Sequence, residues 1–181
     1  MKQVKVITAQ EAALLVKDND VVASNGFVGS VQPEALTSAL EARFLETGAP
    51  RDLTLIYAAS QGNSDGRGGD HFAHEGMLKK AILGHWNAVT ALQKLVNANK
   101  IQAYNLPQGT LAQYFRDVAA HRVGTITHVG LETFADPRVS GGRLNDVTTE
   151  DFVKIIQIDG KDQLFYPRMD INVALIRGTY A

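Results

Sequence analysis

Residues 20–34 read DVVASNGFVGSVQPE and combine a short apolar run, a polar loop with two glycines, and a proline that opens a predicted helix. Gly26 and Gly29 carry no Cβ atom, so the backbone can turn sharply here and present its N–H groups to a ligand. The start of the helix adds partial positive charge, which favours an acyl oxygen or a phosphate. A glycine turn after a strand is also common as plain architecture. This stretch therefore predicts a strand, a loop and a helix, and it leaves ligand binding open.

The composition of the chain restricts its class. Its 181 residues, 45% of them hydrophobic, are enough for one domain with one substantial core. Eighteen basic and 19 acidic residues are spread without a basic cluster, which disfavours a nucleic-acid partner. There is no cysteine, so disulfides, thiolate metal ligands and cysteine nucleophiles are excluded. The start MKQVKVITAQEAA has no apolar core of a signal peptide, and no run of about 18 apolar residues occurs, so we expect a cytoplasmic protein without a membrane partner.

Apolar runs and helical patterns alternate along the chain. Thr8 and Glu11 have the spacing of a capping box and predict a helix over residues 9–17, and further helical patterns cover 34–46, 88–98 and 110–120. Predicted strands begin near residues 20, 53, 81, 101, 125, 153 and 172. Continuous apolar strands separated by helices are typical of a parallel sheet covered on both faces. We therefore expect an α/β fold with an open, mostly parallel sheet and helices on both faces.

The end of the chain carries a separate signal. The run NVALI at 172–176 has the pattern of a central strand, and the sequence ends a few residues after it. Domains seldom stop so soon after a central strand. We therefore expect the chain to continue into a second half, although a terminal strand is the alternative.

Polar loops follow several of the predicted strands, where open α/β sheets bind their ligands. Four such loops begin at residues 24, 60, 105 and 130, and the long glycine-rich segment 60–70 suggests function most directly. Gln108 lies between a strand and a helix, so its amide and the N–H groups after it could stabilise an oxyanion. From the residues alone, a helix-terminal side chain that faces solvent is the favoured alternative.

The segment HFAH suggests a metal site because it holds His71 and His74 beside Glu75, with Asp65 and Asp70 nearby. Zinc requires three or four convergent ligands. The remaining histidines are scattered, at His85, His121 and His128. The pattern therefore favours structural histidines.

Other polar residues are ambiguous or fail known motifs. Ser24, Ser30 and Ser60 lie in loops, but none occupies a GxSxG elbow, so serine hydrolysis is disfavoured. The glycine loop does not match GxGxxG and no GK[ST] occurs, so neither NAD nor ATP is indicated. Four charged residues could bind a carboxylate or phosphate, but internal ion pairs are an equal alternative. They are Arg67, Asp136, Arg138 and Arg143.

Taken together, the loops resemble a known family. NGFVG with PEAL, SQGNSDGRGG with HFAHEG, GHW, AYN with QGT, GLETFADPR, GGRLNDVT, and LFYP with ALIRGTYA occur in this order. The combination resembles the amino-terminal part of family I coenzyme A transferases, from ITAQEAALLVKD to the last residue. The propionate (lactate/acetate) CoA-transferase branch is the most similar.

The resemblance implies a ping-pong reaction of short-chain acyl-CoA metabolism. A glutamate carboxylate attacks the acyl-CoA, and a glutamyl-CoA thioester then passes coenzyme A to a second carboxylic acid. Coenzyme A is a substrate, and no metal or redox cofactor is needed. In the family, the glycine loop, here Gly26, Phe27, Val28 and Gly29, lines the acyl pocket. The glutamine of PQG, here Gln108 followed by Gly109, contributes to the oxyanion site, and Gln61 and Gly62 are expected to border the same cleft.

Two departures from the family pattern matter. Many members have GGFG where this chain has NGFVG, so Val28 is expected to crowd a glycine position and reshape the acyl pocket. The nucleophilic glutamate of the family lies in an ESG or ENG segment, which is absent here, and Glu75 in HEGM does not match it.

The resemblance thus predicts that residues 1–181 are an amino-terminal CoA-transferase domain that is inactive alone. Its expected partners are acyl-CoA, a short-chain carboxylate and a glutamate-bearing second half or subunit. An exposed apolar face is expected where that half packs, and self-association into a homo-oligomer is expected with it. The alternatives are a non-catalytic domain that binds acyl-CoA or an acid, and a relative of acyl-CoA hydrolases.

Overall fold

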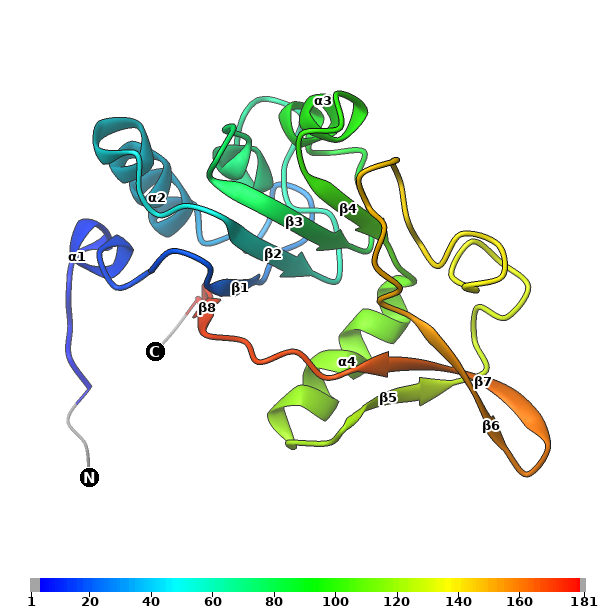
Figure 1. Cartoon of the computed structure of the whole chain (residues 1–181). Coiled ribbons are helices and arrows are strands. Elements are labelled where there is room, and N and C mark those ends of the chain that lie inside the picture. Colours follow the sequence, from blue (N-terminus) through cyan, green and yellow to red (C-terminus); the bar gives the residue numbers. More distant parts are fainter. Residues whose placement is uncertain (1–3, 180–181) are drawn as a thin grey trace.

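The computed structural model describes residues 4–179 (Figure 1). The helices are α1 (Ala9–Ala13), α2 (Glu34–Thr47), the 3-10 helix η1 (Gly68–Phe72), α3 (Thr90–Asn97) and α4 (Gln108–Ala119). The strands are β1 (Val21–Ser24), β2 (Leu53–Tyr57), β3 (Leu78–Leu83), β4 (Gln102–Asn105), β5 (Gly124–Thr127), β6 (Lys154–Ile158), β7 (Lys161–Pro167) and β8 (Val173–Leu175). Within these residues, no helix combines the length and the apolar character that crossing a bilayer requires.

Five strands form a parallel sheet in the order β4-β3-β2-β1-β8. Every neighbouring pair is parallel, with registers such as Val22 opposite Leu55 and Val22 opposite Val173. The carboxyl ends of all five strands therefore meet at one edge of the sheet. The predicted α/β fold with a mostly parallel sheet is confirmed.

Alternate residues of the parallel strands pack into two separate cores. Leu55 and Tyr57 of β2 face a core with α1, α2 and α3, whereas Ile56 faces a second core with α4. Figure 1 shows α2 and α3 on one side of the sheet and α4 on the other. Because both faces are covered, all five residues of β2 are buried.

The strands predicted near residues 125 and 153 do not join the parallel sheet, so that expectation was wrong. They are β5 and β6 of a three-stranded antiparallel sheet in the order β5-β7-β6. Its central strand β7 was not predicted. Asp159 and Gly160 form the two-residue turn between β6 and β7, and both have a positive φ (51° and 72°). An Asp-Gly pair between strands is typical of a β-hairpin, so a signal for β7 was present in the sequence.

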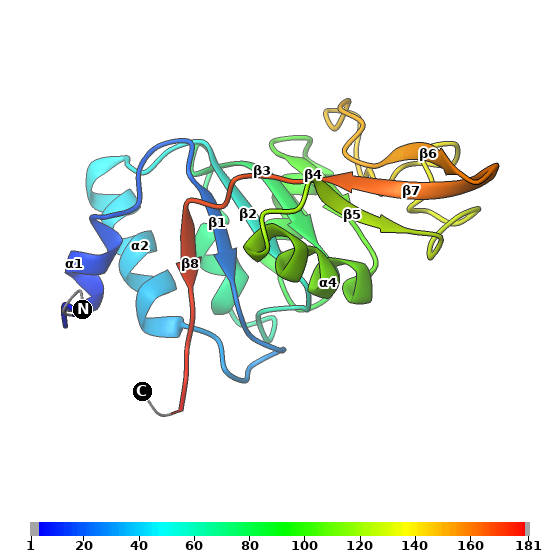
Figure 2. The same cartoon turned by 90° about the horizontal axis from the view of Figure 1, so that it is seen from below.

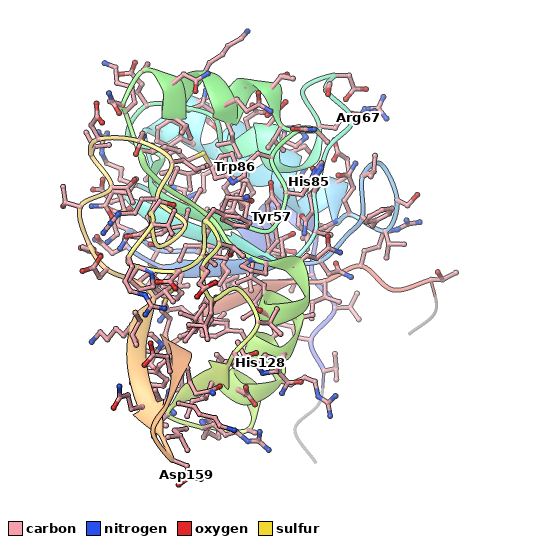
Figure 3. The ribbon with its side chains drawn as sticks, turned by 90° about the vertical axis from the view of Figure 1, so that its right-hand side faces the viewer. Tyr57, Arg67, His85, Trp86, His128 and Asp159 are labelled. Carbon is pink, nitrogen blue, oxygen red and sulfur yellow. The ribbon has the colours of Figure 1, made fainter. Side chains whose placement is uncertain are left out.

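The antiparallel sheet projects beyond the β4 edge of the parallel sheet (Figure 2). Asp159 marks the far end of this hairpin in Figure 3. Leu164 and Tyr166 of β7 are buried in the core that contains α4. The loop from residue 130, which was expected at the carboxyl edge of a parallel strand, instead follows the antiparallel strand β5. Its later part runs beside β4, where Leu144 N–H donates to Ala103 O (3.0 Å).

Two further expectations differ from the structure. The first helix ends at Ala13 and not at residue 17, because the N–H groups of Leu15 and Val16 bond three residues back, to Ala12 and Ala13, in a tight turn. The strand near residue 172 is not central. Within residues 4–179, β8 pairs only with β1 and forms an edge of the sheet.

Candidate functional site

The glycine loop after β1 folds into a tight turn at the carboxyl edge of the sheet. Phe27 and Ser30 exchange two backbone hydrogen bonds of 2.9 Å, which places Val28 and Gly29 at the tip. Val28 has a φ of 51°, in the left-handed region that β-branched residues rarely adopt. Phe27 is 62% exposed and Val28 is 41% exposed. The turn thus presents apolar side chains to solvent at the end of β1.

The loop after β2 pairs directly with this turn. Val28 N–H donates to Ser60 O (2.7 Å), and Gly62 N–H donates to Val28 O (3.1 Å). Gln61 lies opposite Val28 in this short parallel pairing, and it is buried. At Gly62 a Cβ atom would lie 2.3 Å from Ala88 O, so no other residue fits without a shift. The structure therefore brings the predicted residues Gly26 to Gly29, Gln61 and Gly62 into one unit.

Gln108 and Gly109 begin α4, next to the loop after β3. An added Cβ at Gly84 would lie 3.2 Å from Gln108 Cα and 1.8 Å from Ala58 O, so Gly84 allows α4 to approach the end of β2. Both Gln108 and Gly109 are exposed, and a Cβ at Gly109 would meet nothing within 4 Å. Their amide and N–H groups are therefore free to face a ligand at the same edge as the glycine turn.

Buried polar atoms without a hydrogen-bond partner gather around the ends of β1 and β2. Most of the unpartnered atoms found in residues 4–179 belong to this edge: Ser24 Oγ, Gln32 Oε1, Tyr57 OH, Ser60 Oγ, Gln61 Nε2 and Asp70 Oδ2. A buried polar group without a partner costs stability. Such groups are tolerated where function requires them, so this edge is the best candidate for a site.

Helix α2 is joined to the loop after β2 by a chain of carboxylates and imidazoles. His71 Nδ1 lies 2.6 Å from Glu41 Oε2, and His71 Nε2 lies 2.8 Å from Glu34 Oε1. His74 Nε2 lies 2.7 Å from Glu41 Oε1. Burial lowers the pKa of His71, but its hydrogen bonds to Glu34 and Glu41 outweigh burial and raise that pKa overall. These histidines therefore have a clear structural role.

The metal hypothesis finds no geometry to support it. Within residues 4–179, no group of three or more His, Asp or Glu side chains could hold a metal ion. Asp70 accepts hydrogen bonds from the N–H groups of Ala91 and Leu92 (3.0 and 3.2 Å) and so caps α3. Burial raises the pKa of the Asp70 carboxyl in spite of these bonds. Glu75 pairs with Lys100 (3.3 Å).

The charged residues of the other loops mostly form ion pairs with each other. The guanidinium of Arg138 pairs with Asp136 (2.7 Å) and Asp162 (2.8 Å). Arg143 pairs with Asp151. The Arg67 and Asp65 side chains make a looser contact of 3.5 Å. Of the candidate anion-binding residues, Arg67 therefore keeps the most freedom to meet a ligand, and Figure 3 shows it at the loop surface.

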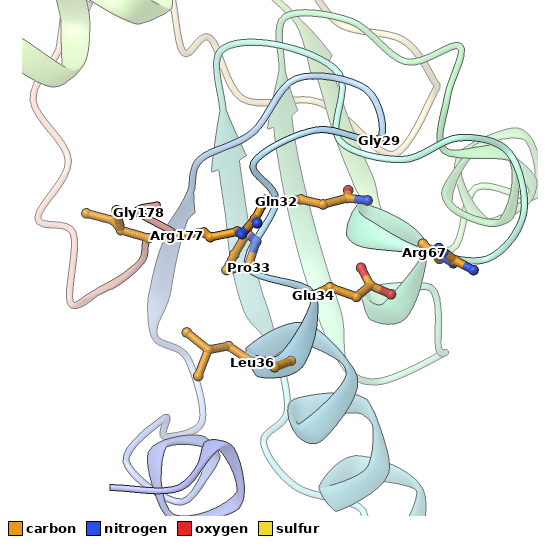
Figure 4. Close-up of a pocket in the computed structure, with 10 residues that line it drawn as sticks. Gly29, Gln32, Pro33, Glu34, Leu36, Arg67, Arg177 and Gly178 are labelled. Carbon is orange, nitrogen blue, oxygen red and sulfur yellow. The ribbon is translucent and has the colours of Figure 1, made fainter. Parts of the chain in front are cut away.

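A pocket of about 480 Å³ opens beside the glycine turn (Figure 4). Gly29 contributes to its wall, and so do residues that the sequence did not single out. The most informative of these is Gln32, which is only 7% exposed. The position of Gln32 directly before Pro33 at a helix start was the one local signal for this residue. Its burial depends on Gly68, which is 36 residues away in the sequence.

Comparisons with known proteins agree with the fold and the loops. A family model described as Coenzyme A transferase matches residues 6–181. The chain is 40% identical over 177 residues to Caffeate CoA-transferase of Acetobacterium woodii, covering 98% of this chain and 34% of that protein. It is 27% identical over 173 residues to Acetate CoA-transferase subunit alpha of Escherichia coli (strain K12), covering 96% of this chain and 69% of that subunit.

A solved structure shows the same arrangement. The apoenzyme of the acyl-CoA transferase YdiF from Escherichia coli O157:H7 superposes with a TM-score of 0.91 at 38% identity, covering 95% of this chain and 34% of that chain. The chain therefore spans about a third of the length of the caffeate CoA-transferase and of the YdiF acyl-CoA transferase that it matches.

Proposed function

The chain belongs to the coenzyme A transferase family, and on this basis we propose that it forms the acyl-binding part of an enzyme that moves coenzyme A from a short-chain acyl-CoA to a carboxylic acid. The relatives named above support CoA transfer in general and act on different acids. Propionate, lactate and acetate are the substrates we propose. The proposal is carried by the carboxyl edge of the sheet, where the glycine turn, the loop after β2 and the start of α4 come together.

The proposed mechanism is a ping-pong reaction through a glutamyl-CoA thioester. Attack of a carboxylate on the thioester carbonyl creates a tetrahedral oxyanion, which N–H donors stabilise as the charge develops. Gln108 and the exposed N–H groups at the start of α4 are suited to this role. The glycine turn would hold the acyl group, with Phe27 and Val28 as its apolar surface. The nucleophilic glutamate would come from a second half.

That second half is the proposed partner. The chain spans about a third of the length of similar enzymes, and one relative is an alpha subunit. Large apolar side chains are exposed on the glycine loop and after β8: Phe27, Val28, Val31 and Ile176. Exposed apolar surface of this kind is typical of an interaction site. We propose that a glutamate-bearing half or subunit covers it in the cytoplasm.

The direct test is transfer of coenzyme A from propionyl-CoA to acetate. The chain is assayed alone and then mixed with the remaining part of the YdiF acyl-CoA transferase. We expect activity only on mixing, and we expect Gln108→Ala to lower kcat about 100-fold or more. Gln113→Ala, on the same helix but farther along it, is the matched control and should leave kcat within about twofold.

Other outcomes would refute parts of the proposal. Activity of the chain alone would mean that a residue within it is the nucleophile. Binding of propionyl-CoA without transfer on mixing would favour a non-catalytic acyl-CoA-binding domain. Release of free coenzyme A without an acceptor acid would indicate a hydrolase.

A further inference from the structure

His71 lies in η1, in the segment that follows β2, and its side chain is buried against helix α2. Each of its ring nitrogens faces a carboxylate of α2: Nδ1 lies 2.6 Å from Glu41 Oε2, and Nε2 lies 2.8 Å from Glu34 Oε1. A neutral imidazole carries one N–H group, so its other nitrogen would turn a lone pair toward a carboxylate oxygen. Only the imidazolium donates from both nitrogens. The geometry therefore fits the protonated form of His71.

The charged groups around His71 favour the same form. His74 Nε2 contacts the other oxygen of the Glu41 carboxylate, at 2.7 Å. Asp70, next to His71 in η1, adds a third carboxylate, and Lys94 of α3 interacts with that carboxylate. Burial lowers the pKa of His71, but hydrogen bonds and attraction from the two carboxylates of α2 raise it overall. The cation therefore persists to a higher pH than that of an ordinary histidine.

One carboxylate of this network is bonded in turn to the loop after β2. Glu34 Oε2 accepts a hydrogen bond from Gly68 N–H (3.1 Å), and the N–H of the next residue, Gly69, donates to Gln61 O (2.7 Å). In Figure 4, the Glu34 side chain points from the start of α2 toward the segment that carries Arg67. The packing is tight, since a Cβ atom on Gly68 would lie 2.7 Å from Gln61 O. A movement of Glu34 would therefore displace the backbone at Gln61.

The backbone around Gln61 also supports the glycine turn. Val28 N–H donates to Ser60 O (2.7 Å), and Gly62 N–H donates to Val28 O (3.1 Å). Val28 has a φ of 51°, and a β-branched residue keeps such a conformation only where its surroundings hold it. Hydrogen bonds and single peptide links therefore connect His71 to the tip of the turn.

Loss of the His71 proton would act on Glu34 more than on Glu41. A neutral ring donates to only one of the two carboxylates, and the other carboxylate then faces a lone pair in a partly buried site. Glu41 keeps its contact with His74 (2.7 Å). The Glu34 side chain is also the more exposed of the two (38% against 26%), so it can turn toward water. The effect of the lost proton is therefore directed toward the loop after β2.

We propose that protonated His71 is a positioning residue for CoA transfer, which holds Glu34 and, through it, the loop after β2 against the glycine turn. His71 acts through Gln61 and Gly62 and not by contact with the substrate. The acyl-CoA therefore binds more tightly below the pH at which His71 loses its proton than above it. This inference rests on the proposed CoA-transferase function for the identity of the reaction.

The first test follows the coupling by NMR on the 181-residue chain, without any transfer reaction. As the pH is raised from 6 to 10, the carbon signals of Val28 and Gly62 should shift with the same midpoint as the His71 ring. Glu41→Gln removes one carboxylate and should lower both midpoints by about one pH unit or more. Glu46→Gln, at an exposed position on the same helix, is the matched control and should leave them unchanged. Val28 and Gly62 signals that do not follow the His71 titration would overturn the inference.

The second test measures transfer from propionyl-CoA to acetate after mixing with the remaining part of YdiF. At pH 6, His71→Gln should raise the KM for propionyl-CoA about tenfold and change kcat less than about threefold. The KM values of the native protein and the variant should converge as the pH is raised to 10, and His128→Gln, at an exposed position, should behave like the native protein.

A purely structural role of His71 gives a different result. Partial unfolding of His71→Gln would lower the amount of active enzyme, and so the apparent kcat, at an unchanged KM, and this result would overturn the inference. If mixing gives no transfer at all, the proposed function fails, and the NMR titration still decides whether His71 holds the loop.

Discussion

The two sheets of this chain differ in how they are covered. In the parallel sheet, all five residues of β2 are buried because helices pack on one face and α4 with the second sheet packs on the other. In the antiparallel sheet, no residue of β6 is fully buried, and Ile126 and Ile158 remain 45% and 44% exposed. The parallel sheet is thus an apolar frame, and the glycine turn, Gln61, Gly62, Gln108 and Gly109 lie at its carboxyl edge.

The antiparallel sheet depends more on polar contacts. Thr125 Oγ1 donates to Asp117 Oδ2 (2.7 Å), and Tyr114 OH donates to Pro167 O (3.0 Å), which joins two of its strands to α4. The Arg138 guanidinium bonds both to Asp136, which lies in the same loop after β5, and to Asp162 of β7. The parallel sheet that carries the candidate site is therefore buried on both faces, whereas the antiparallel sheet combines the buried side chains of Leu164 and Tyr166 with charged and polar contacts at its exposed side.

The largest effect is expected from a core truncation in the parallel sheet. Leu55→Ala removes a fully buried side chain from β2 and should lower the free energy of unfolding by about 2–5 kcal/mol. Ile158→Ala in β6 is the matched change at a half-exposed position and should cost about 1 kcal/mol or less. Urea denaturation measures both. Equal losses would show that the two sheets do not differ in the way described.

Beside the antiparallel sheet, the buried partner of Arg138 should contribute more to the free energy of unfolding than its exposed partner. Asp136 is fully buried and accepts hydrogen bonds from Arg138 Nε (3.0 Å) and from Glu132 N–H (2.9 Å). Asp136→Ala should lower the free energy of unfolding by about 1.5–3 kcal/mol at pH 7. Asp162→Ala removes only the outer, more exposed contact with Arg138 and should cost less than about 1 kcal/mol.

The contact between Asp136 and Arg138 also predicts that the free energy of unfolding falls at acid pH. Hydrogen bonds from Arg138 hold the pKa of Asp136 well below its usual range, although burial alone would raise it. The stability that this carboxylate contributes is therefore present above its unfolded pKa of about 3.9 and is lost as the pH falls toward the folded value. Chemical denaturation gives the free energy of unfolding of the wild-type protein and of Asp136→Ala at pH 7 and at pH 3. The difference between the two proteins should be smaller at pH 3. The same difference at both pH values would refute the stabilising role of the ionised Asp136 carboxylate.

His71 should give the opposite dependence on pH in the parallel region. Its pKa is raised by Glu34 and Glu41 against the effect of burial. Its contribution is therefore full below the unfolded pKa of about 6.5 and is lost as the pH rises through the folded value. His71→Gln should cost about 1–2 kcal/mol at pH 5.5 and less at pH 9. His128→Gln, at an exposed position after β5, is the control, and a cost like that of His71→Gln would argue against the network.

The smallest effect is expected at the tip of the glycine turn. Val28 has a φ of 51°, which costs a β-branched residue about 1–2 kcal/mol. Glycine removes this strain but adds freedom to the unfolded chain, so Val28→Gly should stabilise the protein by about 1 kcal/mol or less. Val123→Gly, at an exposed position before β5 with no positive φ, should instead destabilise it slightly. The midpoint of thermal unfolding should therefore rise for Val28→Gly and fall for Val123→Gly.

The strand, loop and helix at residues 20–34 were predictable because each signal acts locally. The glycines permit the turn, Pro33 fits the helix start, and the following apolar pattern continues to Thr47, one residue beyond the predicted end. The buried run LTLIY of β2 was equally clear, since a strand covered on both faces needs no polar residue. These local signals gave the order of the elements and the loops that hold the candidate site.

The second sheet shows where local reasoning fails. TITHV and VKIIQI are apolar enough to resemble parallel strands, but β7 lies between them and reverses their pairing. The burial of Gln32 is a similar case, because it depends on Gly68 in another loop. No local pattern around either residue encodes that contact.

Local patterns in the amino-acid sequence specified most of the strands and helices, though not β7, as well as the glycine turn and the loops that carry the family resemblance, because these depend on residues that are close together in the chain. The tertiary structure alone decided which strands pair, that β8 lies beside β1 with Val22 opposite Val173, and which polar side chains are buried at the site. The physical reason is that pairing and burial depend on contacts between distant residues. The free energy of those contacts depends on the whole folded chain and not on any one segment.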